Sequence, residues 1–293
     1  MIKRTLNFLS YYFGGLFKRI DEHHIFLSGG GIAFSLLLSL IPFILLVFGI
    51  LGNIIDPMVI EKQIINAIDT IIPYPEYADY TKKAILTRIP GVIEYKTAAA
   101  WVGGFGLFFT STWLFSSMRT VLNNIFHCSD TKGALHGIIR DFAMVLLFIV
   151  LILISTFILP FFNILANITT KNEWLQVFNL EFFLDWIFSL ISFYIIFFSF
   201  FLFYKLIPYA KLGEAVPLVS AFWAAVLWEI ARRVFGYYVS HFLATNKIYG
   251  AFILFAVILF WLFYASCLFI IGAEIGQLYR ERREKRKSKS NTS

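Results

Sequence analysis

The chain has 293 residues, of which 59% are hydrophobic and only 15% are charged. Soluble domains usually carry about 25% charged residues, so this composition excludes a water-soluble globular protein. The formal net charge of +7 comes largely from the stretch after Tyr279. These features predict an all-α, polytopic membrane protein.

Six segments are apolar over the roughly 20 residues that a helix needs to cross a bilayer. We expect spans at approximately residues 26–55, 98–121, 142–167, 182–207, 216–243 and 248–278. Together they form one membrane domain, residues 1–279, which includes an external helical loop at 56–97. A basic cytoplasmic tail follows at 280–293.

The first predicted element is an amphipathic helix that precedes the first span. Its apolar side chains recur at helical spacing and are Leu6, Leu9, Phe13, Leu16 and Ile20. Basic residues flank this stretch at both ends, so we expect a helix that lies on the inner membrane face.

The first span carries small residues on one face, with Gly31, Ser35 and Ser39 at intervals of four and Pro42 after them. Small residues at this spacing allow close helix packing. Pro42 leaves an upstream carbonyl that a neighbour or water must satisfy. Helix packing and the wall of a polar pathway both explain the pattern, and packing is the simpler interpretation.

The fifth span contains three charges, Glu229, Arg232 and Arg233, within an otherwise apolar helix. A charge at mid-bilayer costs roughly 2.5–3.5 kcal/mol, so these groups must pair or face protein or water. Their spacing places them on one face, with the acid N-terminal and one positive charge left over. The cluster could bind an anionic cargo such as a lipid phosphate, or it could be a structural ion pair.

The sixth span offers a further acid, Glu274, between Gly272 and Gly276. We expect Glu274 to pair with the leftover positive charge of the fifth span. The two glycines are candidates for close helix packing or for the wall of a pathway. The basic tail that follows predicts a cytoplasmic anchor beside anionic lipid, and it places both termini inside.

No catalytic, cofactor or metal site is predicted. His127, Cys128 and His136 lie near one another in a loop, but they lack a recognisable zinc spacing. The chain also lacks a phosphate-binding glycine loop and a Ser-His-Asp order, which leans against an enzyme.

Five short motifs follow one another along the chain. They are Ser39-Leu40-Ile41-Pro42, Tyr204 to Pro208, Trp228-Glu229 with Arg232, Tyr249-Gly250-Ala251 and Gly272-Ala273-Glu274. In this order they resemble the YihY/BrkB family of bacterial inner-membrane proteins, over nearly the whole chain. The resemblance implies six spans and the inner membrane, but no settled activity. The family's older label, ribonuclease BN, finds no support in these residues.

The leading functional hypothesis is a transporter or lipid-handling protein for an anionic cargo such as phospholipid, because a net-positive cluster lies among small-residue helices. The alternative is a non-transporting membrane scaffold or assembly partner that uses the N-terminal helix and the basic tail for docking. A ribonuclease is the least supported. Membrane lipids, and not nucleic acid, are the predicted partners, and the sequence names no protein partner.

Overall fold

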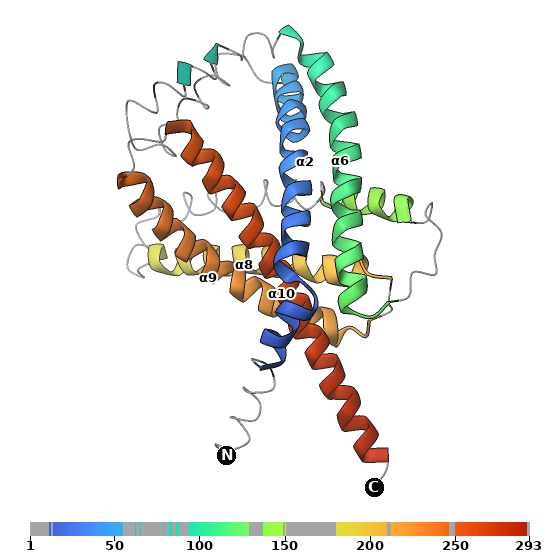
Figure 1. The fold of residues 1–293 in the computed structure, drawn as a ribbon. Helices are drawn as coiled ribbons and strands as arrows, with labels where there is room; N and C mark the ends of the chain where they lie inside the picture. Colours follow the sequence, from blue (N-terminus) through green and yellow to red (C-terminus); the bar gives the residue numbers. More distant parts are fainter. Residues whose placement is uncertain are drawn as a thin grey trace. The chain divides into compact units, whose positions relative to one another are not determined.

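The structure is a computed structural model. It describes Tyr12, residues 14–54, 94–128, 137–148, 180–209, 212–245 and 250–291, and a few single residues elsewhere. These residues are helical or lie in short turns, which confirms the all-α prediction. The long helices, in chain order, are α2 (Ile25–Ile54), α6 (Lys96–Ile125), α8 (Leu180–Leu206), α9 (Ala215–Thr245) and α10 (Gly250–Asn291) (Figure 1).

Four of these helices are long and apolar enough to cross a membrane. The qualifying stretches are Ile25–Ile50, Lys96–Ile125, Ala215–Tyr238 and Phe255–Ser290, and Leu190–Leu206 is a shorter apolar helix. A polytopic membrane protein is therefore confirmed. Most of the predicted third span and most of the external loop lie outside the described residues, so the count of six spans stays a prediction.

The last helix does not end with the predicted sixth span at residue 278. α10 continues without a break to Asn291, which gives it 42 residues. At 1.5 Å per residue the helix is about 63 Å long, roughly twice the 30 Å thickness of the hydrocarbon layer. One end of α10 must therefore extend beyond the hydrocarbon, and the charged end is the C-terminal one.

The chain divides into two compact units. The first unit comprises Met1–Gly29, Phe115–Arg233 and Ala265–Ser293, and the second comprises Gly30–Leu114 and Val234–Tyr264. Four helices, α2, α6, α9 and α10, contribute one part to each unit.

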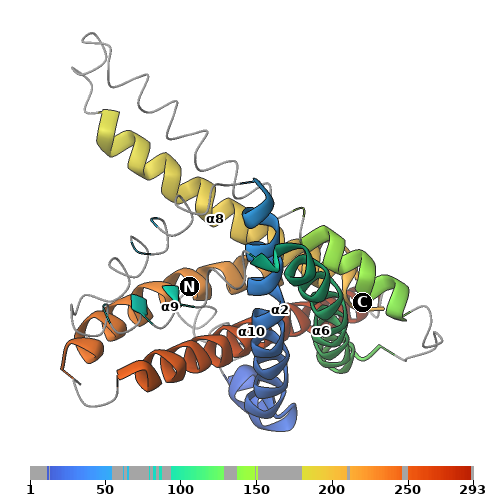
Figure 2. The same cartoon turned by 90° about the horizontal axis from the view of Figure 1, so that it is seen from above.

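In the second unit, α2 and α6 lie side by side and approach closely at glycines (Figures 1 and 2). A methyl group placed on Gly49 would lie 2.5 Å from the backbone nitrogen of Ala100. One placed on Gly106 would lie 2.9 Å from Cβ of Pro42. Pro42 therefore packs against α6, as the packing interpretation predicts.

In the first unit, the glycines of α10 allow α9 to approach. A methyl group on Gly272 would lie 2.7 Å from Cβ of Ala224 and 2.6 Å from the Tyr204 hydroxyl. On Gly276 it would collide with the side chain of Ser220. Both glycines are therefore contact positions for neighbouring helices, and the packing interpretation accounts for them.

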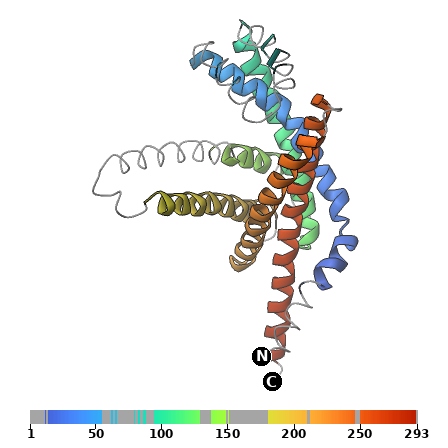
Figure 3. The ribbon, with the colours of Figure 1, turned by 90° about the vertical axis from the view of Figure 1, so that its left-hand side faces the viewer.

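A buried tyrosine joins α8 to α10 within the first unit. The Tyr204 hydroxyl donates to the Phe269 carbonyl at 2.6 Å, and the two rings stack with centroids 5.0 Å apart. Residues 137–148 run beside α8 (Figure 3), where the Phe148 and Phe203 rings lie 6.0 Å apart. Aromatic contacts thus hold this layer together.

Residues 14–22 are helical and pack along the C-terminal half of α10. A methyl group on Gly15 would lie 2.9 Å from a Cδ of Leu278, and Gly29 similarly contacts Cys267. The described part of the predicted amphipathic helix therefore contacts α10, and its position on the membrane face stays a prediction. Leu6, Leu9 and Phe13 lie outside the described residues.

We predict that Gly272→Leu destabilises the protein by about 1–3 kcal/mol, because the added side chain overpacks the contact between α9 and α10. The measurement is the thermal unfolding temperature in detergent. The matched control is Gly236→Leu in α9, where an added Cβ meets nothing within 4 Å. Equal losses of stability in the two variants would contradict this description of the packing.

Candidate functional site

The charges predicted on α9 lie together on one face of the helix. The Glu229 carboxylate accepts hydrogen bonds from Arg232 at 2.8 and 3.1 Å and from Arg233 at 3.0 Å. The Arg232 and Arg233 side chains are 58% and 72% exposed. One carboxylate shared by two guanidinium groups leaves a net positive charge, as the sequence predicts.

Glu274 pairs differently from our expectation. Its side chain is fully buried, its Oε2 accepts from Arg19 at 3.1 Å, and its Oε1 contacts Nδ1 of His23. The partners come from the N-terminal segment, by which we mean Tyr12 and residues 14–24, because that segment runs along α10 at this level. The predicted pairing of Glu274 with the arginines of α9 is therefore corrected to one with Arg19 and His23.

A second acid completes this group. Arg19 also donates to Glu281 at 2.5 Å, and Gln277 donates to Glu281 at 3.2 Å. Burial opposes the charge on Arg19, but hydrogen bonds and attraction to Glu281 and Glu274 outweigh burial and raise the pKa of Arg19. We call Arg19, His23, Glu274 and Glu281 the seam cluster.

The sequence contained a signal for the seam cluster that we did not use. Tyr12, Leu16, Arg19 and His23 are spaced four, three and four residues apart, which puts them on one helical face. That face carries an arginine and a histidine among apolar residues. A buried acid on another helix needs partners of this kind.

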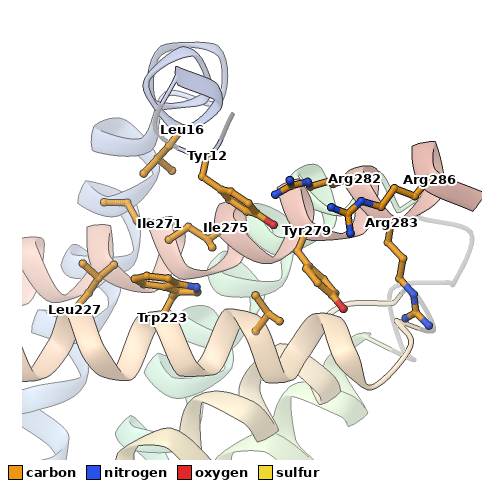
Figure 4. Close-up of a pocket in the computed structure, with 11 residues that line it drawn as sticks. Tyr12, Leu16, Trp223, Leu227, Ile271, Ile275, Tyr279, Arg282, Arg283 and Arg286 are labelled. Carbon is orange, nitrogen blue, oxygen red and sulfur yellow. The ribbon is translucent and has the colours of Figure 1, made fainter. Parts of the chain in front are cut away.

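A pocket of about 490 Å³ is shown in Figure 4, and one of its lining residues, Ile275, is the chain neighbour of Glu274. The N-terminal segment, α9 and α10 contribute its lining, which consists of Tyr12, Leu16, Val219, Trp223, Leu227, Ile271, Ile275, Tyr279, Arg282, Arg283 and Arg286. The three arginines gather at one end, and aliphatic residues and Trp223 line the other. The Arg282 guanidinium lies 5.6 Å from the centre of the Tyr12 ring, a cation–π contact.

The residues that line the pocket suit an amphipathic ligand that carries a negative charge. Guanidinium groups bind phosphate and carboxylate oxygens bidentately, and an apolar wall binds hydrocarbon. Sequence reasoning assigned these arginines to a general membrane anchor. Helical spacing of Ile275, Tyr279, Arg282 and Arg286 on one face would have indicated that the basic tail continues an apolar surface.

The small polar residues of the first span have their hydroxyls occupied. Ser35 donates to the Gly31 carbonyl at 3.0 Å and Ser39 donates to the Ser35 carbonyl at 2.8 Å. A Cβ placed on Gly31 would meet nothing within 4 Å, so this glycine does not mark a close helix approach. Both donor hydrogens are therefore used within the helix, and the wall of a polar pathway stays a prediction.

A further buried charge pair lies at the end of α6. Arg119 pairs with Asp141 and donates to the Gly137 carbonyl at 3.1 Å. Burial raises the pKa of Asp141, although the charge and hydrogen bond of Arg119 act against this. The guanidinium carbons of Arg119 and Arg140 lie 5.5 and 5.3 Å from the centre of the Tyr209 ring. Arg119 therefore holds two segments of the first unit together.

Comparisons with known proteins identify a family and several relatives. A family model described as virulence factor BrkB matches residues 16–293. A UPF0761 membrane protein of Cronobacter sakazakii is 24% identical, over 89% of this chain and 85% of its own length. One from Vibrio parahaemolyticus is 25% identical, over 90% and 80%. No solved structure matches the chain.

The family model covers nearly the whole chain, including α9, α10 and most of the segment that carries the seam cluster. The resemblance found in the sequence motifs is thereby confirmed. This chain belongs to the BrkB family of membrane proteins.

Proposed function

We propose that this protein is a lipid-handling transporter of the bacterial inner membrane that binds an anionic phospholipid in the pocket of the first unit. The observation that carries the proposal is the polarity of that pocket. Arg282, Arg283 and Arg286 lie at one end of it, and an apolar wall lies at the other.

The dimensions and residue types of the pocket suit a lipid. Its volume of about 490 Å³ lies within the roughly 300–1,000 Å³ of typical ligand sites. The arginines suit the phosphate, because a planar guanidinium offers two parallel donors to its oxygens. Trp223, Leu227 and Ile271 suit part of an acyl chain.

The position of the arginines along α10 also favours a headgroup. No Lys or Arg occurs between Gly250 and Tyr279, and basic residues then follow from Arg280 onward. The arginines therefore come where the helix leaves the hydrocarbon, at the depth of lipid phosphates. The excess of positive charge at this end favours the cytoplasmic leaflet as the source of lipid.

The cluster on α9 supplies a second positive position. Arg232 follows Trp223 by nine residues, about 14 Å further along the same helix. Arg232 and Arg233 carry two positive charges, whereas Glu229 carries one negative charge, so the cluster is net positive. A lipid phosphate that moves along α9 away from the pocket would next meet this charge.

We predict that Arg282→Gln/Arg283→Gln/Arg286→Gln weakens binding of phosphatidylglycerol by about tenfold or more, because the charge-assisted hydrogen bonds to phosphate are lost. Native mass spectrometry of the detergent-solubilised protein measures this affinity. The matched control, Lys285→Gln/Lys287→Gln/Lys289→Gln, removes the same charge from tail residues that do not line the pocket. If both triple variants lose affinity equally, binding is only non-specific attraction to the tail.

We predict that Arg232→Gln slows movement of labelled anionic phospholipid across liposomes by about tenfold, while binding at the pocket is unchanged. The assay is loss of label from one leaflet of vesicles that contain the purified protein. Lys205→Gln, which removes an exposed charge on α8 that pairs with Glu214, is the control and should transport normally. If the wild-type protein moves neither anionic nor neutral lipid, transport is ruled out and the scaffold hypothesis takes its place.

A further inference from the structure

The N-terminal segment and α10 meet along one antiparallel seam in the first unit. Tyr12 lies against Arg282, Gly15 against Leu278, and Arg19 and His23 against Glu274. Sequence numbers rise along one helix as they fall along the other. The wall of the pocket and the seam cluster are therefore neighbouring parts of a single helix contact.

The charges in the seam cluster do not balance when His23 is neutral. Arg19 carries the single fixed positive charge and faces two carboxylates, those of Glu274 and Glu281. The other titratable ring close to His23 is that of His127, from the turn after α6, at 6.3 Å between centroids. One added proton would remove the uncompensated negative charge of the cluster.

The His23 ring is placed to accept that proton. Its Nδ1 contacts the Glu274 carboxylate, and an ionised carboxylate only accepts hydrogen bonds, so Nδ1 carries a hydrogen. A further proton, taken from bulk water, therefore binds Nε2 and makes the ring an imidazolium. The side chain is 23% exposed, which leaves the ring within reach of solvent. Imidazole normally changes charge between about pH 5 and pH 8.

We infer that His23 and Glu274 form a proton-binding site that controls how firmly the N-terminal segment closes the pocket. The ionised Glu274 carboxylate accepts a hydrogen bond from either form of the ring, but the imidazolium adds the attraction of opposite charges and so holds the seam closed more firmly. Loss of the proton weakens the contact that keeps Tyr12 and Leu16 in the pocket wall. The regulatory consequence rests on the proposed lipid-binding function of the pocket, whereas the proton site itself does not.

The test measures the seam directly, with spin labels at Lys18→Cys and Lys287→Cys in a chain that also carries Cys128→Ser and Cys267→Ala. Both labelled positions are exposed. Distances are recorded by pulsed electron resonance in nanodiscs of neutral phospholipid, at about pH 5.5 and about pH 8. At the lower pH we expect one short distance between the labels. At the higher pH the population at long distance, relative to that at short distance, should rise about tenfold.

Two histidine variants separate the proton site from a general effect of pH. His23→Gln should abolish the pH response. His24→Gln, which changes the neighbouring exposed histidine, should leave the response intact. Glu274→Gln should lengthen the distance at both pH values. The inference is overturned if the distance distribution is the same at both pH values in the labelled chain with His23 and Glu274 intact. A pH response that survives His23→Gln also overturns it. The nanodiscs contain no anionic lipid, so this outcome is independent of whether the pocket binds one.

Discussion

The burial of the Glu274 carboxylate is the constraint on which the rest of the first unit depends. An ionised acid with no exposure is costly unless charged or hydrogen-bonding partners surround it. On α9, Arg232 and Arg233 already pair with Glu229. The partners of Glu274 come instead from the N-terminal segment. Pairing with Arg19 and His23 holds that segment against α10 and thereby builds one wall of the pocket.

Two properties of α10 shape the first unit. The helix is apolar for most of its length and turns basic without a break, so one surface passes directly from Ile271 and Ile275 to Arg282 and Arg286. The small residues Gly272 and Gly276 bring α9 close on another face of the same helix. Close packing on one face and a pocket on another therefore follow from a single helix.

Much of the fold could be predicted from composition and local spacing. Hydropathy depends on each segment alone, so the sequence predicts the all-α membrane class. It also predicts the ends of α8 and α9 to within a few residues. The shared face of Glu229, Arg232 and Arg233 follows from the helical repeat alone, and the structure confirms it.

The partners of Glu274 were not accessible in this way, because a buried acid can be satisfied from any neighbouring helix. An amphipathic pattern also does not show which protein surface a helix contacts, so the packing of the N-terminal segment against α10 was not predicted. Similarly, the spacing of Ser35 and Ser39 does not show that each hydroxyl donates to the carbonyl four residues earlier, as the structure does.

The central claim is that the first unit holds an anionic phospholipid between α9, α10 and the N-terminal segment. An electron cryomicroscopy structure in nanodiscs that contain phosphatidylglycerol tests it most directly. Lipid density should occupy the pocket, with its phosphate within hydrogen-bonding distance of at least one of Arg282, Arg283 and Arg286. A pocket that stays empty, or that holds an acyl chain with no phosphate near these arginines, would contradict the claim.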